Sequence, residues 1–75
     1  MRNISDVAYE IRKLWKKPYF GAVPYIETMM SLSDKDSMYI CDSATDIVIR
    51  FLGNANTWRG EDARRIKKEL KDIIA

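Results

Sequence analysis

Apolar residues recur at spacings of three and four along most of this chain, which is the pattern of amphipathic helices. The clearest stripe falls within residues 43–54 and consists of Ala44, Ile47, Val48, Phe51, Leu52 and Ala55 just beyond it. Asp42 or Ser43 precedes the stripe, and either short side chain can accept a hydrogen bond from a free amide of the first turn. Gly53 follows it and tolerates the backbone conformation in which many helices end. We therefore predict a helix over 43–54, with Phe51 fully buried.

Two further helices are predicted in the first half of the chain. Residues 3–17 carry an apolar stripe that includes Trp15, and Pro18 ends this helix because proline lacks an amide hydrogen and restricts the residue before it. Residues 23–32 form the second helix, with a proline in its first turn. This helix is apolar over half of its circumference, which is typical of a helix that packs against more than one neighbour.

The last predicted helix covers residues 58–74, and its apolar positions are Ala63, Ile66, Leu70, Ile73 and Ile74. Residues 38–41 are ambiguous between a short extended segment and a helical turn. We predict no strand there, because we find no second strand candidate to pair with it. The fold class expected for residues 1–75 is therefore all-α, as a single compact domain. We expect a bundle of three main helices, over about 3–17, 23–32, and 43–54 and/or 58–74 as the C-terminal pair, with a short irregular segment near 38–41.

The composition is that of a globular protein, since 47% of the residues are hydrophobic and 32% are charged. No apolar run approaches the roughly 20 residues that a membrane-spanning helix needs. The single cysteine, Cys41, cannot form a disulfide within the chain. We therefore expect a cytoplasmic protein that is not embedded in a membrane.

Residue types that support catalysis are scarce. The chain has no histidine, so Cys41 has no imidazole to activate it and is expected to be a structural thiol. Asp34, Asp36 and Asp42 loosely suggest a calcium loop, but the glycine and the terminal glutamate of that motif are missing. No glycine-rich phosphate loop is present. We expect no enzyme activity, metal, cofactor or small-molecule substrate.

Four residues are candidates for binding a partner. Trp58 and Arg59 are of the types that dominate interface hot spots. The commoner alternative is that Trp58 packs inside and plugs the turn before the last helix. Tyr19 and Tyr25 belong to a Tyr/Met-rich segment, 19–30, that is either core or an adhesive surface. Core is the expected outcome, because a chain this small needs most of its aromatic side chains inside.

The last helix also carries a basic face that faces solvent and can contact phosphates. Its residues are Arg64, Lys67, Lys68 and Lys71. A solvated helix face is the commoner role for such a stripe. Acidic residues on the same helix, Glu61, Glu69 and Asp72, limit the basic footprint.

Several segments together resemble a group of small uncharacterised proteins encoded by bacteriophages, prophages and mobile elements, largely of Gram-positive bacteria. These segments are residues 18–25, 42–44, 51–55, 57–61, 63–64, 66–67 and 69–70, of which the Trp-Arg-Gly-Glu turn at 58–61 is the most specific. The resemblance assigns no role to individual residues. It implies an accessory protein that binds and modulates another protein, such as a host defence or replication factor.

Three functions thus remain open on the sequence. The first is protein binding, and the second is nucleic-acid binding through the basic face of the last helix. The third is a structural homodimer that hides the Tyr/Met-rich segment 19–30.

Overall fold

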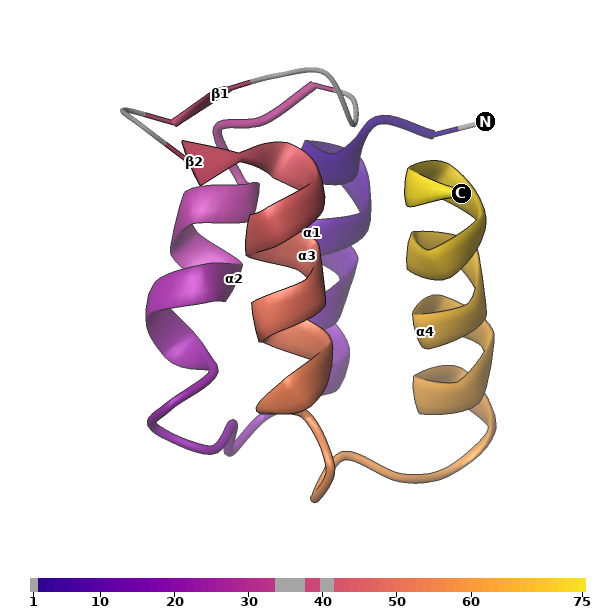
Figure 1. The fold of residues 1–75 in the computed structure, drawn as a ribbon. Coiled ribbons are helices and arrows are strands. Elements are labelled where there is room, and N and C mark those ends of the chain that lie inside the picture. Colours follow the sequence, from indigo (N-terminus) through magenta and orange to yellow (C-terminus); the bar gives the residue numbers. More distant parts are fainter. Residues whose placement is uncertain (1, 34–37, 40–41) are drawn as a thin grey trace.

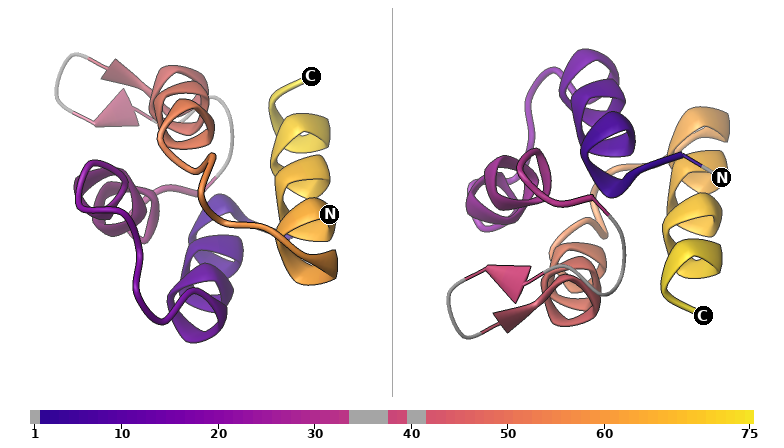
Figure 2. Two further views of the ribbon diagram at one scale, coloured as in Figure 1. Left: turned by 90° about the horizontal axis from the view of Figure 1, so that it is seen from below. Right: turned by 90° about the horizontal axis from the view of Figure 1, so that it is seen from above.

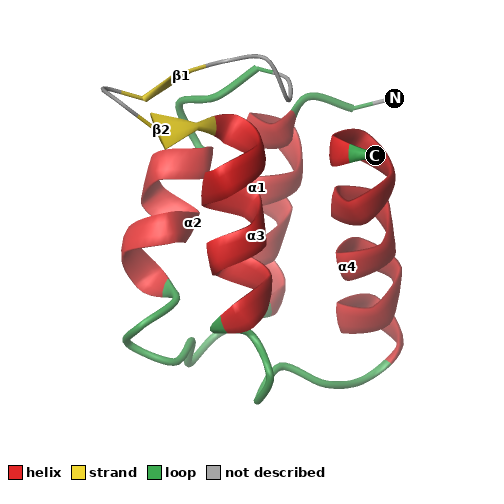
Figure 3. Cartoon of the chain, viewed as in Figure 1, coloured by secondary structure: helices red, strands yellow, loops and turns green. Residues whose placement is uncertain are grey.

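Four helices account for most of the chain, and the prediction of an all-α bundle is confirmed (Figure 1; Figure 3). The structure is a computed structural model that describes residues 2–33, 38–39 and 42–75. Its helices are α1 (Ile4–Leu14), α2 (Val23–Met29), α3 (Ala44–Gly53) and α4 (Glu61–Ile74). No helix in these ranges has the length and apolar character needed to cross a membrane.

The helices run alternately down and up, and each contacts two neighbours. α1 packs against α2 and α4, and α3 packs against the same two helices. Figure 2 shows α1, α2 and α3 nearly end-on, whereas α4 lies obliquely across one side of them. The connections 15–22 and 54–60 meet at one end of the bundle, which we call the loop end (Figure 1).

The core collects one apolar face from every helix, as the spacing predicts. Phe51 of α3 is fully buried, which confirms its predicted position. The other large side chains with almost no exposed surface are Ile4, Val7, Ile11, Met29, Val48, Ile66 and Leu70. Because these residues come from all four helices, the apolar face of each helix is buried by contact with the others.

α1 is shorter at its C-terminus than predicted. The helix ends at Leu14, and the amide of Trp15 donates the last helical hydrogen bond to the carbonyl of Ile11 at 2.8 Å. Trp15 then leaves the helical conformation, with φ −93° and ψ 89°. The prediction of helix through residue 17 was wrong, because the chain turns at Trp15 towards α2.

α2 also ends early, at Met29, where 23–32 was predicted. The chain continues to Leu32 in turns with hydrogen bonds between residues three positions apart. The carbonyls of Leu32 and Ser33 then bind the first turn of α1. They accept hydrogen bonds from the amides of Ser5 at 2.9 Å and Ile4 at 2.8 Å. These two carbonyls therefore cap the start of α1, where no side-chain cap is formed.

A small hairpin precedes α3 and corrects the prediction that residues 38–41 have no strand partner. Met38–Tyr39 (β1) pairs in antiparallel fashion with Asp42–Ser43 (β2), with Met38 opposite Ser43. The partner strand was overlooked because it is only two residues long and lies next along the chain. The expectations for Cys41, Asp34 and Asp36 fall outside the described residues.

The ends of the two C-terminal helices follow their local chemistry. Ser43 is the N-cap of α3, and its Oγ accepts a hydrogen bond from the amide of Asp46 at 3.2 Å. α4 begins at Glu61, three positions after the predicted start at Trp58. The preceding residue, Gly60, has φ 113°, a left-handed conformation that favours glycine and interrupts any helix beginning earlier.

Candidate protein-interaction surface

The two tryptophans stack on each other at the loop end. Their ring centroids are 5.5 Å apart with planes within 9°, and Trp15 meets Phe51 edge to face at 6.4 Å. Only 6% of Trp58 is exposed. The structure therefore agrees with the interpretation in which Trp58 packs inside the protein. A partner could reach its indole only if the core opened.

Lys67 fixes the connection in which Trp58 lies. Its ammonium donates hydrogen bonds to the carbonyls of Ala55 at 2.8 Å and Trp58 at 2.7 Å. Burial lowers the pKa of Lys67, and the nearby cations Lys71 and Arg59 lower it further. The expectation that Lys67 faces solvent was wrong, because the ammonium turns inward onto these two carbonyls.

The two connections of the loop end touch each other at Gly21. A Cβ atom on Gly21 would lie 2.6 Å from Tyr19 Cε2 and 2.9 Å from Asn54 Oδ1, so only glycine fits without displacing them. Asn54 is itself held in place, since its Nδ2 donates a hydrogen bond to the carbonyl of Arg50 at 2.8 Å. This close approach places the turn that carries Tyr19 beside the end of α3.

Tyr19 and Phe20 are both on the surface of this turn. Phe20 is 79% exposed and Tyr19 is 44% exposed. Their ring centroids are 4.8 Å apart, at a tilt of 50°. The expectation that the aromatics of this segment lie in the core was therefore wrong for these two residues, because the turn carries them away from the helices.

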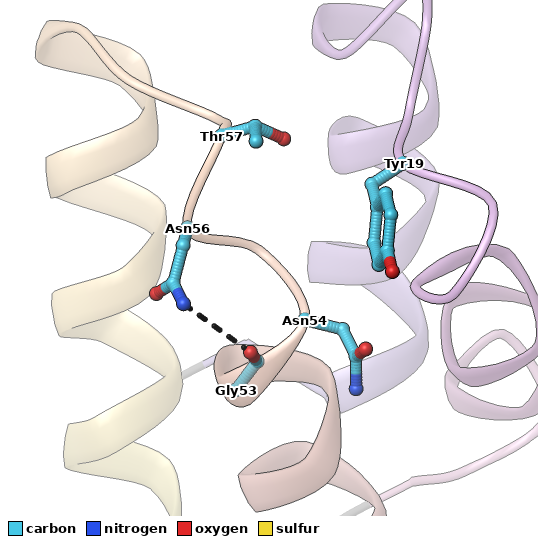
Figure 4. Close-up of a pocket in the computed structure, with 5 residues that line it drawn as sticks. All are labelled: Tyr19, Gly53, Asn54, Asn56 and Thr57. Atoms are coloured by element: carbon cyan, nitrogen blue, oxygen red, sulfur yellow. Dashed lines mark hydrogen bonds between the residues drawn. The ribbon is translucent and has the colours of Figure 1, made fainter.

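A pocket of about 270 Å³ lies beside Tyr19 (Figure 4). Its lining consists of Tyr19, Gly53, Asn54, Asn56 and Thr57. In Figure 4 the tyrosine ring stands on one side and Asn56 and Thr57 stand on the other. Asn56 Nδ2 contacts the carbonyl of Gly53 at 3.5 Å. The pocket thus offers one aromatic wall and several short polar side chains, and we call Phe20 together with this lining the Tyr19–Phe20 surface.

The other two predicted partner-binding residues, Arg59 and Tyr25, lie in different environments. Arg59 is exposed and follows the pocket residue Thr57 by two positions. Tyr25 is half-buried on α2 and packs against the core. Of the four predicted partner-binding residues, the structure leaves Tyr19 and Arg59 on the surface of the loop end and keeps Trp58 inside.

The basic face of α4 offers fewer free cations than the sequence indicates. Lys67 is bound to backbone carbonyls, and Lys68 pairs with Asp72 at 3.2 Å. Arg64 and Lys71 are exposed and pair with no acidic group among the described residues. Of the four basic residues that the sequence places on this face, two therefore have no partner among the described residues.

An ion-pair network between α1 and α4 was not predicted. Arg2 forms a two-pronged contact with Glu69, through Nε at 2.9 Å and Nη2 at 2.6 Å, and its Nη1 lies 2.6 Å from Glu10. Arg65 also pairs with Glu10, at 2.9 Å. Arg2 holds the pKa of Glu69 below its usual value, while Arg65 and then Arg2 do the same for Glu10. This network joins the N-terminal segment and α1 to α4.

Sequence reasoning had no signal for these contacts. Arg2 and Glu69 are separated by 67 positions, and no periodic pattern relates them. For Phe20, core was the preferred of two interpretations, although its place next to Gly21 in a turn was a signal for exposure. Among the described residues, no group of three acidic, cysteine or histidine side chains is placed to hold a metal ion.

Comparison of the chain with known protein families, curated protein sequences and solved structures finds no match.

Proposed function

We propose that this chain is a small accessory protein that binds and modulates another protein through the Tyr19–Phe20 surface. The observation that carries the proposal is the 79% exposure of Phe20, whose ring packs on the exposed ring of Tyr19. Exposed aromatic side chains that lie together are unfavourable in water and become favourable when a partner covers them. Aromatic residues of this kind are the usual anchors of protein interfaces.

The rigidity of the loop end supports the same role. Trp15 and Trp58 stack beneath it, and Lys67 ties the 54–60 connection to α4. A surface that is fixed before binding loses little conformational entropy when a partner docks. The pocket beside Tyr19 adds a depression that one side chain of the partner can enter.

Nucleic-acid binding through α4 is the second candidate and is less well supported. Phosphate binding gains affinity from several clustered, unpaired cations. Two of the four cations predicted for this role are engaged, Lys67 with carbonyls and Lys68 with Asp72. A homodimer that covers Phe20 is a further alternative, since a second copy would bury the same rings.

The proposed class of partner is inferred from the resemblance to small phage-encoded proteins. Small phage-encoded proteins often act by binding and modulating a host or phage protein. A host defence or replication factor in the bacterial cytoplasm is the partner class that we propose.

Photo-crosslinking tests the proposal directly. A photoreactive amino acid is placed at position 20 in the full chain, which is produced in the bacterial host, and the same residue is placed at position 49 as a matched control. Ile49 is suitable because it is 53% exposed on α3 and does not line the pocket beside Tyr19. We expect one protein to be crosslinked from position 20 and not from position 49.

The crosslinked protein is then purified, and its affinity is measured by calorimetry. Phe20→Ser should weaken binding by about 2 kcal/mol or more, the range of an interface anchor, and Ile49→Ser should leave it unchanged. Equal crosslinking from both positions, or crosslinks only to a second copy of the chain, would refute the proposal; the latter result would support the homodimer.

A further inference from the structure

Tyr9 stands on the exposed side of α1 and lines two hollows that are separate from the Tyr19–Phe20 surface. It is 54% exposed, although it lies in the middle of a helix whose other face is fully buried. One hollow, of about 360 Å³, is lined by Tyr9, Arg12, Lys13 and Met30, and we call it the Tyr9 groove. The groove spans α1 and the end of α2, which lie side by side (Figure 2).

The Tyr9 groove combines apolar walls with unpaired positive charge. The ring of Tyr9 and the thioether of Met30 supply the apolar part. Arg12 makes one weak contact, from Nη1 to Met30 Sδ at 3.7 Å. Neither Arg12 nor Lys13 pairs with an acidic group in the part of the chain that the structure describes, so both cations remain able to bind an anion.

The neighbouring hollow has a different electrostatic character. It measures about 400 Å³ and includes Asp6 and Glu10 as well as Arg2 and Lys13. Glu10 and Arg2 already pair with each other at 2.6 Å. Charge within this second hollow is therefore largely balanced, whereas charge in the Tyr9 groove is positive.

We infer that the Tyr9 groove docks an acidic segment of a partner protein. An apolar side chain of that segment lies against Tyr9 and Met30, and flanking carboxylates pair with Arg12 and Lys13. A guanidinium binds a carboxylate through two parallel hydrogen bonds, which makes Arg12 the stronger of the two contacts. This docking site is additional to the Tyr19–Phe20 surface and does not depend on it.

An acidic peptide fits the groove better than a nucleic-acid strand does. A strand presents a continuous line of phosphates and gains its affinity from several cations along that line. Charge in the neighbouring hollow is largely balanced, so the two cations of the groove do not continue there as the line of cations that a strand would use. A peptide needs only the two local cations and an apolar contact.

Nuclear magnetic resonance titration of the full chain tests the inference with defined probes. The probes are a short capped peptide of glutamates and leucines, the matching peptide of lysines and leucines, and a short oligothymidylate. We expect the glutamate peptide alone to give saturable shifts, centred on the amides of Tyr9, Arg12, Lys13 and Met30. The affinity should fall as salt rises, because the carboxylate contacts are partly screened.

Matched variants establish which side chains carry the binding. Tyr9→Ser should weaken the glutamate peptide about fivefold or more. Ile49→Ser, at a residue of nearly equal exposure, should not. Arg12→Glu should weaken binding about tenfold at low salt, and Lys71→Glu, with the same change of charge on α4, should have little effect. Phe20→Ser should leave peptide binding intact, since its surface is separate.

Three outcomes would overturn the inference. They are the absence of saturable shifts in the groove, an equal response to the lysine peptide, and tighter binding of the oligothymidylate through the same residues. The last result would assign the groove to phosphate recognition. Because all probes are chosen without reference to the Tyr19–Phe20 surface, each outcome leaves the proposed function to be judged by its own experiment.

Discussion

Lys67 Nζ donates a 2.7 Å hydrogen bond to the backbone carbonyl of Trp58. A cation on the last helix thereby fixes the residue whose indole stacks on Trp15 in the core. The same ammonium also binds the carbonyl of Ala55. Lys67 is thus a structural residue, and it holds in place the connection that forms one wall of the pocket beside Tyr19.

Replacing Lys67 by methionine should destabilise the protein. The methionine keeps the apolar part of the lysine stem but leaves two carbonyls without their charged donor. We expect the free energy of unfolding to fall by roughly 1–3 kcal/mol, as for other hydrogen bonds to charged groups. Urea denaturation followed by circular dichroism measures this change. Lys71→Met is the control, because Lys71 is exposed on the same helix, and an equal loss in both variants would contradict the prediction.

Phe51→Ala should remove most of the stability of the domain. Phe51 has no exposed surface and lies against Trp15, so truncation leaves a cavity in the centre of the core. Such truncations cost roughly 3–5 kcal/mol. The variant should lose its cooperative thermal transition or melt far below the wild type. A melting temperature within a few degrees of the wild-type value would contradict the burial of this ring; Ile49→Ala is the exposed control.

Arg2→Gln should destabilise the protein in a way that depends on pH. At neutral pH we expect a loss of roughly 0.5–1 kcal/mol, because Arg2 is partly exposed. The pKa values of Glu10 and Glu69 are lowered in the folded state, so their contribution is present above the unfolded value of about 4.3. It is lost as pH falls through the folded pKa values.

The stabilities of wild type and Arg2→Gln should therefore converge as the solution becomes acidic. Urea denaturation at a series of pH values provides the measurement. Lys68→Gln is a suitable comparison, since its pair with Asp72 is far more exposed and should contribute less. A difference between wild type and Arg2→Gln that stays constant down to the lowest pH would show that the network does not stabilise the fold through its charges.

Duplex DNA should bind weakly. With Lys67 and Lys68 engaged, α4 presents few free cations, and we expect a Kd no tighter than about 10⁻⁵ M near physiological salt. Fluorescence anisotropy with a generic duplex measures it. The double variant Lys68→Gln/Lys71→Gln preserves Lys67 and therefore the fold. Submicromolar affinity that this variant abolishes would favour the nucleic-acid alternative.

The sequence determined the parts of the fold that depend on neighbours along the chain. α3 is the clearest case, because Ser43 caps it, its apolar residues recur at helical spacing, and Phe51 lies in the middle of that stripe. The all-α class and the core face of α4 follow from the same periodicity. These features were predictable because a helix places residues three and four positions apart on one side.

The ends of the helices were only partly determined by the sequence. α1 stops at Leu14 and α2 at Met29, each about three residues before its predicted end. In both cases a contact with another part of the chain competes with the next helical turn. Trp15 leaves α1 to stack on Trp58, and the residues after Met29 cap the start of α1.

Only the tertiary structure decided which side chains of the candidate site are exposed. The composition of residues 57–61 is compatible with a buried or an exposed Trp58, and Trp15, its stacking partner, is distant in the sequence. The same holds for Lys67, whose carbonyl acceptors belong to a connection outside its own helix. Tyr19 and Phe20 lie on the surface because they belong to the turn between α1 and α2, and no periodicity along the chain indicates which aromatic side chains the core takes.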